Sequence, residues 1–401
     1  MADTDSSGAV SSVWDRNLSN ALPRTPTQPE PAPDHPQQHP QQPFVLYHIS
    51  TKPKKQALTE HPSASSGTVS THLVLVEYDG IYVLALEVQV YRSPLHTTLF
   101  VSKADSTGFC KLNLRVLVSA ILRVLLTATA RPEIPTRICL FARAQPQYLF
   151  PDSGSNGFKH VLSDRQLIRW WIKTLDPLLS LFTPPPLARL LIPGADKAEL
   201  KPALQSSSAL WSAGHIFHTD TSSLAIETVP NFPDDPKSRF LDSLAAENRG
   251  RETTVAHFFD ELQMRQEFLL GFVVGIIGVE GVISCSSSSS SSSSSSEDEH
   301  LGAVVEMKTY TRIHDAIVTG NYGSIRDTRN ATAAVRMAMP EGSRFEIMGT
   351  LVGEEQSRKK TEPVKTPAVN VMSGMMVRKR AKPPRDVATA PEQTKKAKIE
   401  E

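Results

Sequence analysis

Residues 137–171 read RICLFARAQPQYLFPDSGSNGFKHVLSDRQLIRWW and place three different kinds of local pattern in one span. The apolar run 138–141 has the composition of a buried strand. A loop with turn-forming residues and the basic pair Lys159–His160 follows it. Residues 163–164 can then cap a helix that carries Trp170–Trp171. A strand, a basic loop and an aromatic helix can supply a floor, a grip for an anion and an apolar wall, so this span predicts a ligand site.

Strand patterns dominate the chain before this span, and helical patterns become more frequent after it. The clearest signal is the alternating stretch 71–93, which is interrupted at Asp79–Gly80 and predicts a hairpin. The expected strands are 44–50, the two arms of 71–93, 99–101, 138–141, 211–217 and 223–228, and the expected helices are 112–127, the segment from 163 to beyond 171, the segment after Asp235, and 255–270. These elements predict a mixed α/β fold with one central, mostly antiparallel sheet surrounded by helices.

Composition divides the 401 residues into five parts. They are a Pro/Gln-rich arm (1–43) expected to be disordered, a core (44–283), a Ser-rich acidic linker (284–300), a small helical part that completes the core (301–353), and a basic tail (354–401). The net charge is only +1, but the tail concentrates basic residues at 378–382 and 395–398. Such runs are typical of a nuclear-localisation signal or of a histone or DNA contact, and equally of a solvated tail.

Other classes of protein are disfavoured by what the sequence lacks. The three cysteines have no paired spacing, which argues against a structural zinc and for a reducing compartment. The most apolar run, 269–279, is too short to cross a membrane. There is no P-loop, dinucleotide fingerprint, HExxH or GxSxG motif.

Three stretches remain whose residues are more specific than packing requires: 100–105 (FVSKAD), Trp170–Trp171, and 232–240 (FPDDPKSRF). Each also has an ordinary structural explanation. The first can be a turn after a strand, and the two indoles can simply pack. In the third, Asp235 can be a helix N-cap with Pro236 at the first helical position.

Taken together, these stretches resemble the fungal histone acetyltransferases that work with histone chaperones and modify lysine 56 of histone H3. The resemblance spans 44–281 and is carried by FVSKADSTG (100–108), the pieces of 138–171, FPDDPKSRF (232–240) and ELQMRQEF (261–268). It implies a single acetyltransferase core similar in fold to the metazoan CBP-type enzymes. It also implies direct transfer of acetyl from acetyl-coenzyme A to a lysine, without a metal.

The resemblance also assigns roles to individual positions. It implies cofactor contacts from Ala104, Asp105, Ser106, Phe141, Gln145, Tyr148, His160, Val161, Leu162 and Trp170. It implies catalytic roles for Asp235, Trp171 and Tyr148, autoacetylation of Lys237, and supporting roles for Asp234 and Arg239. The segment 111–136 is shorter than in better-known members, so the sequence does not support a phosphate contact from Arg115.

These residue types suit the chemistry. Coenzyme A carries a pyrophosphate, which Lys159 and His160 can meet, and a long apolar arm, which Phe141, Tyr148 and the two tryptophans can flank. A lysine of ordinary pKa, about 10.4, must lose its proton before it can attack, and a carboxylate of pKa about 4 is a poor acceptor for that proton. We therefore expect Asp235 to position the ammonium, with the proton leaving through water or Tyr148.

The function expected from the sequence is acetylation of histone H3 in a ternary complex, with lysine 56 favoured and tail lysines secondary. The implied partners are histones H3–H4 and chaperones of the nucleosome-assembly and anti-silencing types. The implied setting is nuclear chromatin, in nucleosome assembly, transcription regulation, DNA damage and genome stability. The alternative is a non-enzymatic nuclear histone- or DNA-binding protein that uses its basic tail.

Overall fold

The computed structural model describes residues 12–24, 43–61, 66–183, 185–217, 220–233, 235–264, 273–283 and 301–350. All of these belong to one compact unit within Met1–Glu354. The predicted linker 284–300 and basic tail 354–401 lie outside the described residues, and both stay predictions. None of the described helices is long and apolar enough to cross a membrane.

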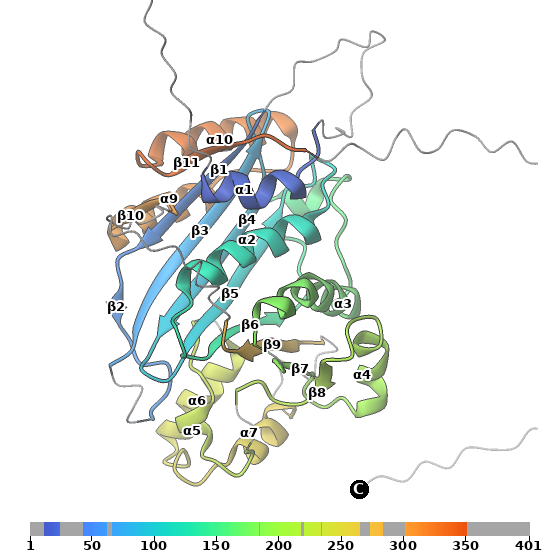
Figure 1. Cartoon of the computed structure of the whole chain (residues 1–401), viewed down its shortest axis with the longest axis vertical. Coiled ribbons are helices and arrows are strands. Elements are labelled where there is room, and N and C mark those ends of the chain that lie inside the picture. The colour runs from blue at the N-terminus through green and yellow to red at the C-terminus, as the bar shows by residue number, and fades with distance from the viewer. Residues whose placement is uncertain are drawn as a thin grey trace, which may run out of the picture. The chain divides into compact units, whose positions relative to one another are not determined.

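One large twisted sheet runs through the centre of the described chain (Figure 1). Its strands lie in the order β10-β1-β3-β4-β5-β6-β9-β7-β8, while β11 also pairs with β1 and β2 with β3. Their bounds are β1 Phe44–Thr51, β2 Lys54–Lys55, β3 Thr68–Tyr78, β4 Ile81–Arg92, β5 Thr97–Ser106, β6 Thr136–Ala142, β7 Leu187–Leu191, β8 Trp211–Ala213, β9 Gly275–Gly281, β10 Ala303–Val305 and β11 Arg344–Ile347. Only β10 with β1, β5 with β6 and β7 with β8 pair in parallel along that order. The prediction of a mixed fold with a mostly antiparallel sheet is confirmed.

The predicted hairpin forms the middle of the sheet. Strands β3 and β4 pair along almost their whole length, from Thr68 opposite Arg92 to Tyr78 opposite Ile81. Asp79 and Gly80 connect them with φ angles of 50° and 73°. Positive φ at both turn positions matches the twist of the flanking strands, and this is why an Asp-Gly pair is favoured there.

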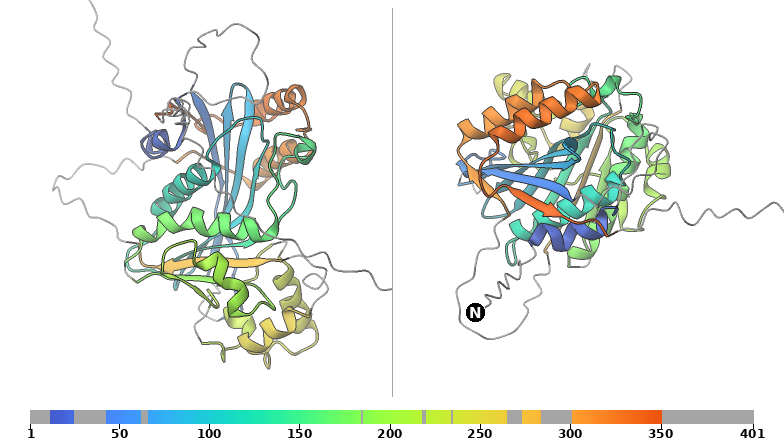
Figure 2. Two further views of the ribbon diagram at one scale, coloured as in Figure 1. Left: turned by 90° about the vertical axis from the view of Figure 1, so that its right-hand side faces the viewer. Right: turned by 90° about the horizontal axis from the view of Figure 1, so that it is seen from above.

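Helices cover both faces of the sheet (Figure 2). Their bounds are α1 Val13–Leu18, α2 Leu114–Thr129, α3 Asp164–Leu175, α4 Lys197–Leu204, α5 Ala225–Thr228, α6 Pro236–Ala246, α7 Val255–Leu262, α9 Met307–Val318 and α10 Ile325–Ala338. Helices α1 and α2 pack together on one face, and α9 and α10 pack on the other. Helices α6 and α7 lie on the side of α9, lower in the view. Three hydrophobic clusters result, one under α2 and α3, one under α6 and α7, and one under α9 and α10.

The expectation of a disordered arm over 1–43 is wrong for residues 12–24. Ser12 caps α1, and Trp14, Leu18 and Leu22 of this segment are completely buried in the main core. The Trp14 indole also donates a hydrogen bond of 2.6 Å to the Leu301 carbonyl oxygen. Three apolar residues in a polar surrounding give too weak a periodic signal, because their burial depends on a surface made by distant parts of the chain.

Several element boundaries also differ from those predicted. Residues 223–228, predicted as a strand, contain the short helix α5, and the strand predicted at 211–217 ends at Ala213, before Gly214 with its φ of 144°. The helix predicted at 255–270 ends at Leu262, and residues 265–270 lie outside the described part.

Strand β9 was not predicted at all, because its glycines disfavour a strand. The fold has a use for at least one of them. A Cβ on Gly278 would lie 2.5 Å from Cγ1 of Ile216, so a side chain there would clash with the segment that packs over this strand.

The chain after the serine tract returns to the first strand. Strand β10 pairs in parallel with β1, with Ile49 opposite Ala303, and β11 pairs antiparallel with β1, with Phe44 opposite Ile347. Between them, α9 and α10 cover the face of the sheet that α2 leaves open. Residues 301–350 therefore complete the same core that begins at residue 44.

Candidate active site

A cavity of about 420 Å³ lies between β5, β6, α2, α3 and the loop 143–162. Its lining includes every residue predicted to contact the cofactor, together with Trp171: Ala104, Asp105, Ser106, Phe141, Gln145, Tyr148, His160, Val161, Leu162 and Trp170. The structure thus brings residues from four separate parts of the sequence into one wall. We call this the cofactor cavity.

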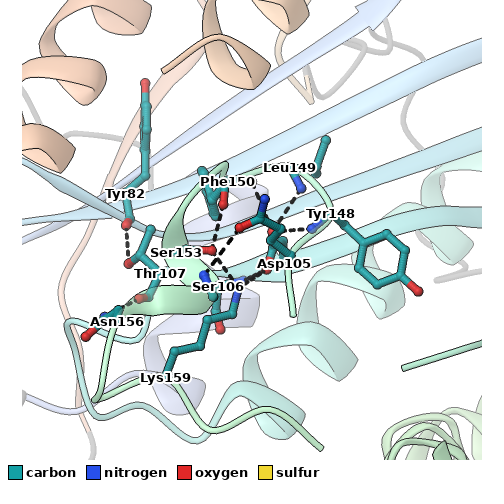
Figure 3. Close-up of polar contacts among 12 residues, drawn as sticks. Tyr82, Asp105, Ser106, Thr107, Tyr148, Leu149, Phe150, Ser153, Asn156 and Lys159 are labelled. Carbon is teal, nitrogen blue, oxygen red and sulfur yellow. Dashed lines mark hydrogen bonds and ion pairs between the residues drawn. The ribbon is translucent and has the colours of Figure 1, made fainter. Parts of the chain in front are cut away.

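Asp105 holds the loop that forms much of that wall (Figure 3). Its Oδ2 accepts hydrogen bonds from the backbone amides of Tyr148, Leu149 and Phe150, at 2.7, 2.9 and 3.0 Å. Its Oδ1 accepts hydrogen bonds from the Lys159 Nζ at 2.7 Å and from the Ser106 amide at 2.8 Å. With all these partners the carboxylate holds the loop 143–162 in place. The Asp105 side chain therefore shapes the cavity by positioning the loop residues that line it.

The expectation that Lys159 meets phosphates is not met by this structure. Its ammonium is 2.7 Å from both Asp105 Oδ1 and Ser153 Oγ, and its side chain is only 8% exposed. Gly108 allows this close approach, since a Cβ there would lie 2.7 Å from the Lys159 Cα, and its φ of 83° suits glycine. A basic residue in a loop looks available in the sequence, but here a buried carboxylate 54 positions away uses its charge.

The tryptophan pair is held by α3. Ser163 and Gln166 form a capping box at the start of this helix, which fixes its first turn. The rings of Trp170 and Trp171 lie edge to face, with centroids 4.9 Å apart and planes at 88°. Both line the cofactor cavity, although Trp171 is 95% buried, so the helix presents an aromatic corner to the ligand space.

Tyr148 is oriented by the loop in which it lies. Its hydroxyl donates a hydrogen bond to the backbone carbonyl of Arg143. The pKa of Tyr148 is raised to about 12, mainly by burial, with Arg143 lowering it and Asp105 and Asp164 raising it. The phenol therefore stays protonated at neutral pH, which weakens the prediction that Tyr148 takes up a lysine proton.

A second cavity, of about 520 Å³, lies on the α9 side of the sheet. Asp235 and Arg239 line it from α6, and Met307, Tyr310 and His314 line it from α9. We call this the acceptor cavity. It shares part of its wall with the cofactor cavity, through Val101, Ser102, Lys103, Phe141, Arg143, Gln145 and Tyr148. The two spaces therefore adjoin along these residues at the carboxyl ends of β5 and β6.

Lys237 lies behind this junction, completely enclosed. Its Nζ is 2.5 Å from Asp235 Oδ2 and also donates to the Pro230 carbonyl oxygen. Three aromatic rings surround the ammonium, with centroids 4.8 Å away for Phe232, 5.2 Å for Phe141 and 5.5 Å for Phe217. Burial lowers the pKa of Lys237, while the Asp235 carboxylate opposes that shift. An aromatic cage around a cation is a stabilising arrangement, and Lys237 is not among the residues that line either cavity.

The Asp235 carboxylate makes two kinds of contact in the structure. As the N-cap of α6 it accepts hydrogen bonds from the Lys237 amide at 3.0 Å and from the Ser238 hydroxyl at 3.1 Å. The same carboxylate pairs with the Lys237 ammonium and lines the acceptor cavity. Asp234, predicted to support it, lies outside the described residues.

The sequence interpretation missed several charged residues of the site. Arg115, for which no contact was expected, lines the cofactor cavity from the first turn of α2. Lys103 and Arg143 line both cavities, and Glu87 lines the acceptor cavity. A signal for Lys103 was present, since it is one of the two charged residues in the FVSKAD stretch, but no pattern along the chain linked it to Glu87.

The side chains that line the cofactor cavity fit a long ligand with an anionic end. The cofactor cavity combines the cations Lys103, Arg115 and Arg143 with aliphatic and aromatic walls. The part of the chain that the structure describes contains no cluster of three or more His, Cys, Asp or Glu side chains that could hold a metal. Two adjoining cavities, one with cations beside apolar walls and one with a carboxylate, are what a group-transfer enzyme with a bulky donor and a cationic acceptor requires.

Comparison with known proteins makes this class specific. The sequence model of the histone acetyltransferase KAT11-type domain matches residues 37–131 and 123–338. This chain belongs to the KAT11-type family of histone acetyltransferases.

Named relatives are fungal. Histone acetyltransferase RTT109 of Candida albicans is 43% identical over 142 residues, 35% of this chain and 38% of that relative. Histone acetyltransferase rtt109 of Schizosaccharomyces pombe is 29% identical over 307 residues, 72% of this chain and 80% of the relative, and that of Aspergillus flavus is 33% identical over 298 residues, 58% and 52%. The matches thus span well under two thirds of the Candida and Aspergillus relatives. The crystal structure of Rtt109 from Aspergillus fumigatus covers 85% of this chain and all of that one, with a TM-score of 0.70 and 25% identity. The resemblance stated from the sequence is confirmed.

Proposed function

We propose that this protein transfers an acetyl group from acetyl-coenzyme A directly to a lysine of histone H3, with lysine 56 the favoured target and N-terminal tail lysines secondary. The observation that carries the proposal is the junction of the two cavities. A space lined by all ten predicted cofactor residues meets a space that contains Asp235. The names of the relatives support a histone as the acceptor.

Acetyl-coenzyme A would supply the acetyl group as an activated thioester. We propose that Arg115 and His160 bind its phosphates, because they line the cavity and Lys159 is already engaged. Phe141 and the tryptophan corner would flank the apolar arm and direct its end toward the shared wall.

The acceptor lysine would enter through the acceptor cavity as a cation. Asp235 would orient its ammonium, since a carboxylate at a helix N-terminus is held rigidly and attracts positive charge. The proton would leave to water, because Tyr148, with a pKa of about 12, is a phenol at neutral pH and its hydroxyl already donates to a backbone carbonyl. In an Asp235→Asn variant we therefore expect loss of most activity with the limb in which the rate rises with pH unchanged. Disappearance of that limb would make Asp235 the proton acceptor.

We propose that the substrate is presented as H3–H4 by histone chaperones of the nucleosome-assembly and anti-silencing types, in the nucleus, and that the reaction serves nucleosome assembly and genome stability. The direct test is acetylation of H3–H4 with and without each chaperone, followed by site mapping by mass spectrometry. Acetyl-lysine at position 56 that rises with a chaperone is the expected result.

Two simpler measurements separate this proposal from a non-enzymatic histone-binding protein. Acetyl-coenzyme A should raise the melting temperature, and mass spectrometry should find acetyl on Lys237 after incubation with it. No thermal shift and no acetyl on Lys237 would favour the binding protein.

A further inference from the structure

Glu87 is a buried carboxylate for which the proposed function has given no role. It lies in the middle of β4 and is 5% exposed. Polar side chains from two other elements converge on it: Ser102 Oγ at 2.6 Å and Lys103 Nζ at 3.7 Å from β5, and Tyr310 Oη at 2.6 Å and His314 Nε2 at 3.7 Å from α9. A buried carboxylate is costly to keep unless it is paired and hydrogen-bonded, so a cluster of this kind has a structural or functional use.

An irregularity in the sheet creates the cluster. The pairing of β4 with β5 shifts between Glu87 and Val88, so that Glu87 lies opposite Lys103 while Val88 lies opposite Val101. Ser102 is the extra residue of this bulge. Neighbouring side chains of a regular strand point to opposite faces, but a bulge re-aims them, and here both Ser102 and Lys103 reach the same carboxylate.

Lys103 is thereby held where the two cavities meet. It lines both of them, and its side chain is 28% exposed. In a direct transfer the acceptor nitrogen must reach the acyl carbon of the bound donor. The reaction therefore has to take place along the wall that the two cavities share. Lys103 and Arg143 are the basic residues of that wall, and we follow Lys103 because its Nζ lies 3.7 Å from the buried Glu87 carboxylate.

We propose that Lys103, positioned by Glu87, is the positive charge that faces the reacting thioester. This inference rests on the proposed acetyl transfer. There, the substrate ammonium first releases a proton to water. The neutral amine nitrogen then bonds to the carbonyl carbon, the carbon–sulfur bond breaks, and the amine's second proton ends on the sulfur, so that amide, thiol and one released proton are the products.

The Lys103 charge would act on two points of this reaction. Negative charge develops on the carbonyl oxygen and the departing sulfur, and a fixed cation in a partly dehydrated site stabilises it. The same cation disfavours a second ammonium nearby, which promotes the neutral form of the acceptor lysine. Glu87 would keep Lys103 in place, and Tyr310 connects that arrangement to the C-terminal part of the chain.

Binding of coenzyme A itself provides a test that needs no turnover. A free thiol has a pKa of about 8.5. A neighbouring ammonium should lower the pKa of the bound coenzyme A thiol by roughly one unit. Calorimetric titration of coenzyme A across pH 6.5–9.5 should show this shift with the wild type and with Lys103→Arg. It should be absent with Lys103→Met, whose side chain has similar length and no charge.

Turnover provides the second readout. In Lys103→Met we expect kcat to fall roughly 10- to 100-fold, the range for losing one electrostatic contact to a transition state. The limb of its pH–rate profile in which the rate rises with pH, which reports deprotonation of the acceptor ammonium, should move up by about one unit, whereas Lys103→Arg should retain both properties. Glu87→Gln should lose about 3- to 10-fold in kcat, since the ammonium stays but is held less firmly. Lys201→Met, at an exposed position on α4, is the matched control and should behave as wild type.

Each failure has a distinct meaning. A coenzyme A thiol with the same pKa in Lys103→Met as in wild type overturns the assignment, and so does a Lys103→Arg variant as impaired as Lys103→Met. Should Lys103→Met fail to fold, Lys103→Arg and Glu87→Gln carry the same test. A wild type that shifts the thiol pKa through Lys103 but acetylates no histone contradicts the proposed function and leaves the Lys103 assignment standing.

Discussion

The two walls of the site each contain a buried lysine–aspartate pair, and the pairs have opposite surroundings. Asp105 and Lys159 lie 2.7 Å apart among backbone amides and hydroxyls, with side chains 4% and 8% exposed. Asp235 and Lys237 lie 2.5 Å apart, 2% and 1% exposed, with aromatic rings around the ammonium. The first pair is one part of a dense polar network, whereas the second depends on its own charge balance and on cation–π contacts.

This difference shows that one pair of residue types can do two kinds of work. The Asp105 carboxylate has five donors, one at the end of β5, three consecutive amides at 148–150 and the Lys159 ammonium, so it determines the shape of the cofactor cavity. The Asp235 carboxylate holds a helix and still faces open space in the acceptor cavity. We therefore expect the first pair to matter more for stability and the second more for chemistry.

The largest effect is expected from Asp105→Asn. It leaves the buried Lys159 ammonium without its counter-charge and weakens three backbone hydrogen bonds, which should lower the free energy of unfolding by about 3–5 kcal/mol. Urea denaturation measures this, and coenzyme A affinity should fall with it because the loop lines the cofactor cavity. The double variant Asp105→Asn/Lys159→Met should recover little, since the amides still lack a carboxylate. Recovery to within about 1 kcal/mol would show that this pair is an isolated ion pair after all.

A third buried pair, His48 and His72, is uncharged at neutral pH, so it should affect stability only when the pH is lowered. His48 Nε2 lies 3.1 Å from His72 Nδ1, and burial lowers their pKa values to about 4 and about 3. The unfolded chain takes up protons below pH 6.5 while the folded one does not, so stability is lost as pH falls from 6.5 toward 4. At pH 5.5 the loss should be about 1.4 kcal/mol for each histidine, about 3 kcal/mol together.

Unfolding measured between pH 7.5 and 5.5 tests this value. His72→Gln should remove about 1.4 kcal/mol of the stability lost between these two pH values. A slope that survives in His72→Gln would place the acid sensitivity in other groups.

A smaller effect is expected from Lys237→Met. Methionine fills the aromatic cage, but Asp235 loses its counter-charge, and we expect a cost of about 2 kcal/mol. The double variant Asp235→Asn/Lys237→Met should return to within about 1 kcal/mol of wild type, because asparagine caps a helix well and a buried ion pair can often be replaced by apolar contacts. Its stability should be restored while its acetylation of histone is not, and restored activity would contradict a role for Asp235 in positioning the acceptor.

The smallest effect is expected from an exposed pair. Arg165 and Glu199 lie 3.4 Å apart between α3 and α4, with side chains 59% and 52% exposed. Glu199→Gln should change the free energy of unfolding by less than about 0.5 kcal/mol, and less at high salt. A cost above about 1 kcal/mol in thermal or urea unfolding would mean that burial is not what makes the two buried pairs more important for stability than an exposed one.

The sequence was a good guide wherever the chemistry is repeated along the chain. Alternation and an Asp-Gly turn predicted the central hairpin, and the capping residues predicted α3 and α6. The resemblance selected cofactor residues that all line one cavity. Sequence reasoning failed where a segment depends on a distant surface, as for Trp14 in α1, and where glycine fits a crowded strand, as for Gly278 in β9.

By itself, then, the sequence determined the class of fold, the family, and which residue types the site would contain, because strand periodicity, turns and caps depend on neighbours within a few positions. How the charged side chains are paired depends on contacts between distant parts of the chain. Lys159 pairs with Asp105, which is 54 positions away in the sequence, and Tyr310 donates a hydrogen bond to Glu87, which is 223 positions away. A bulge of one residue turns Lys103 toward that same carboxylate. The use of a charged side chain depends on which partner folding brings within a few ångströms, and no local pattern in the chain records that choice.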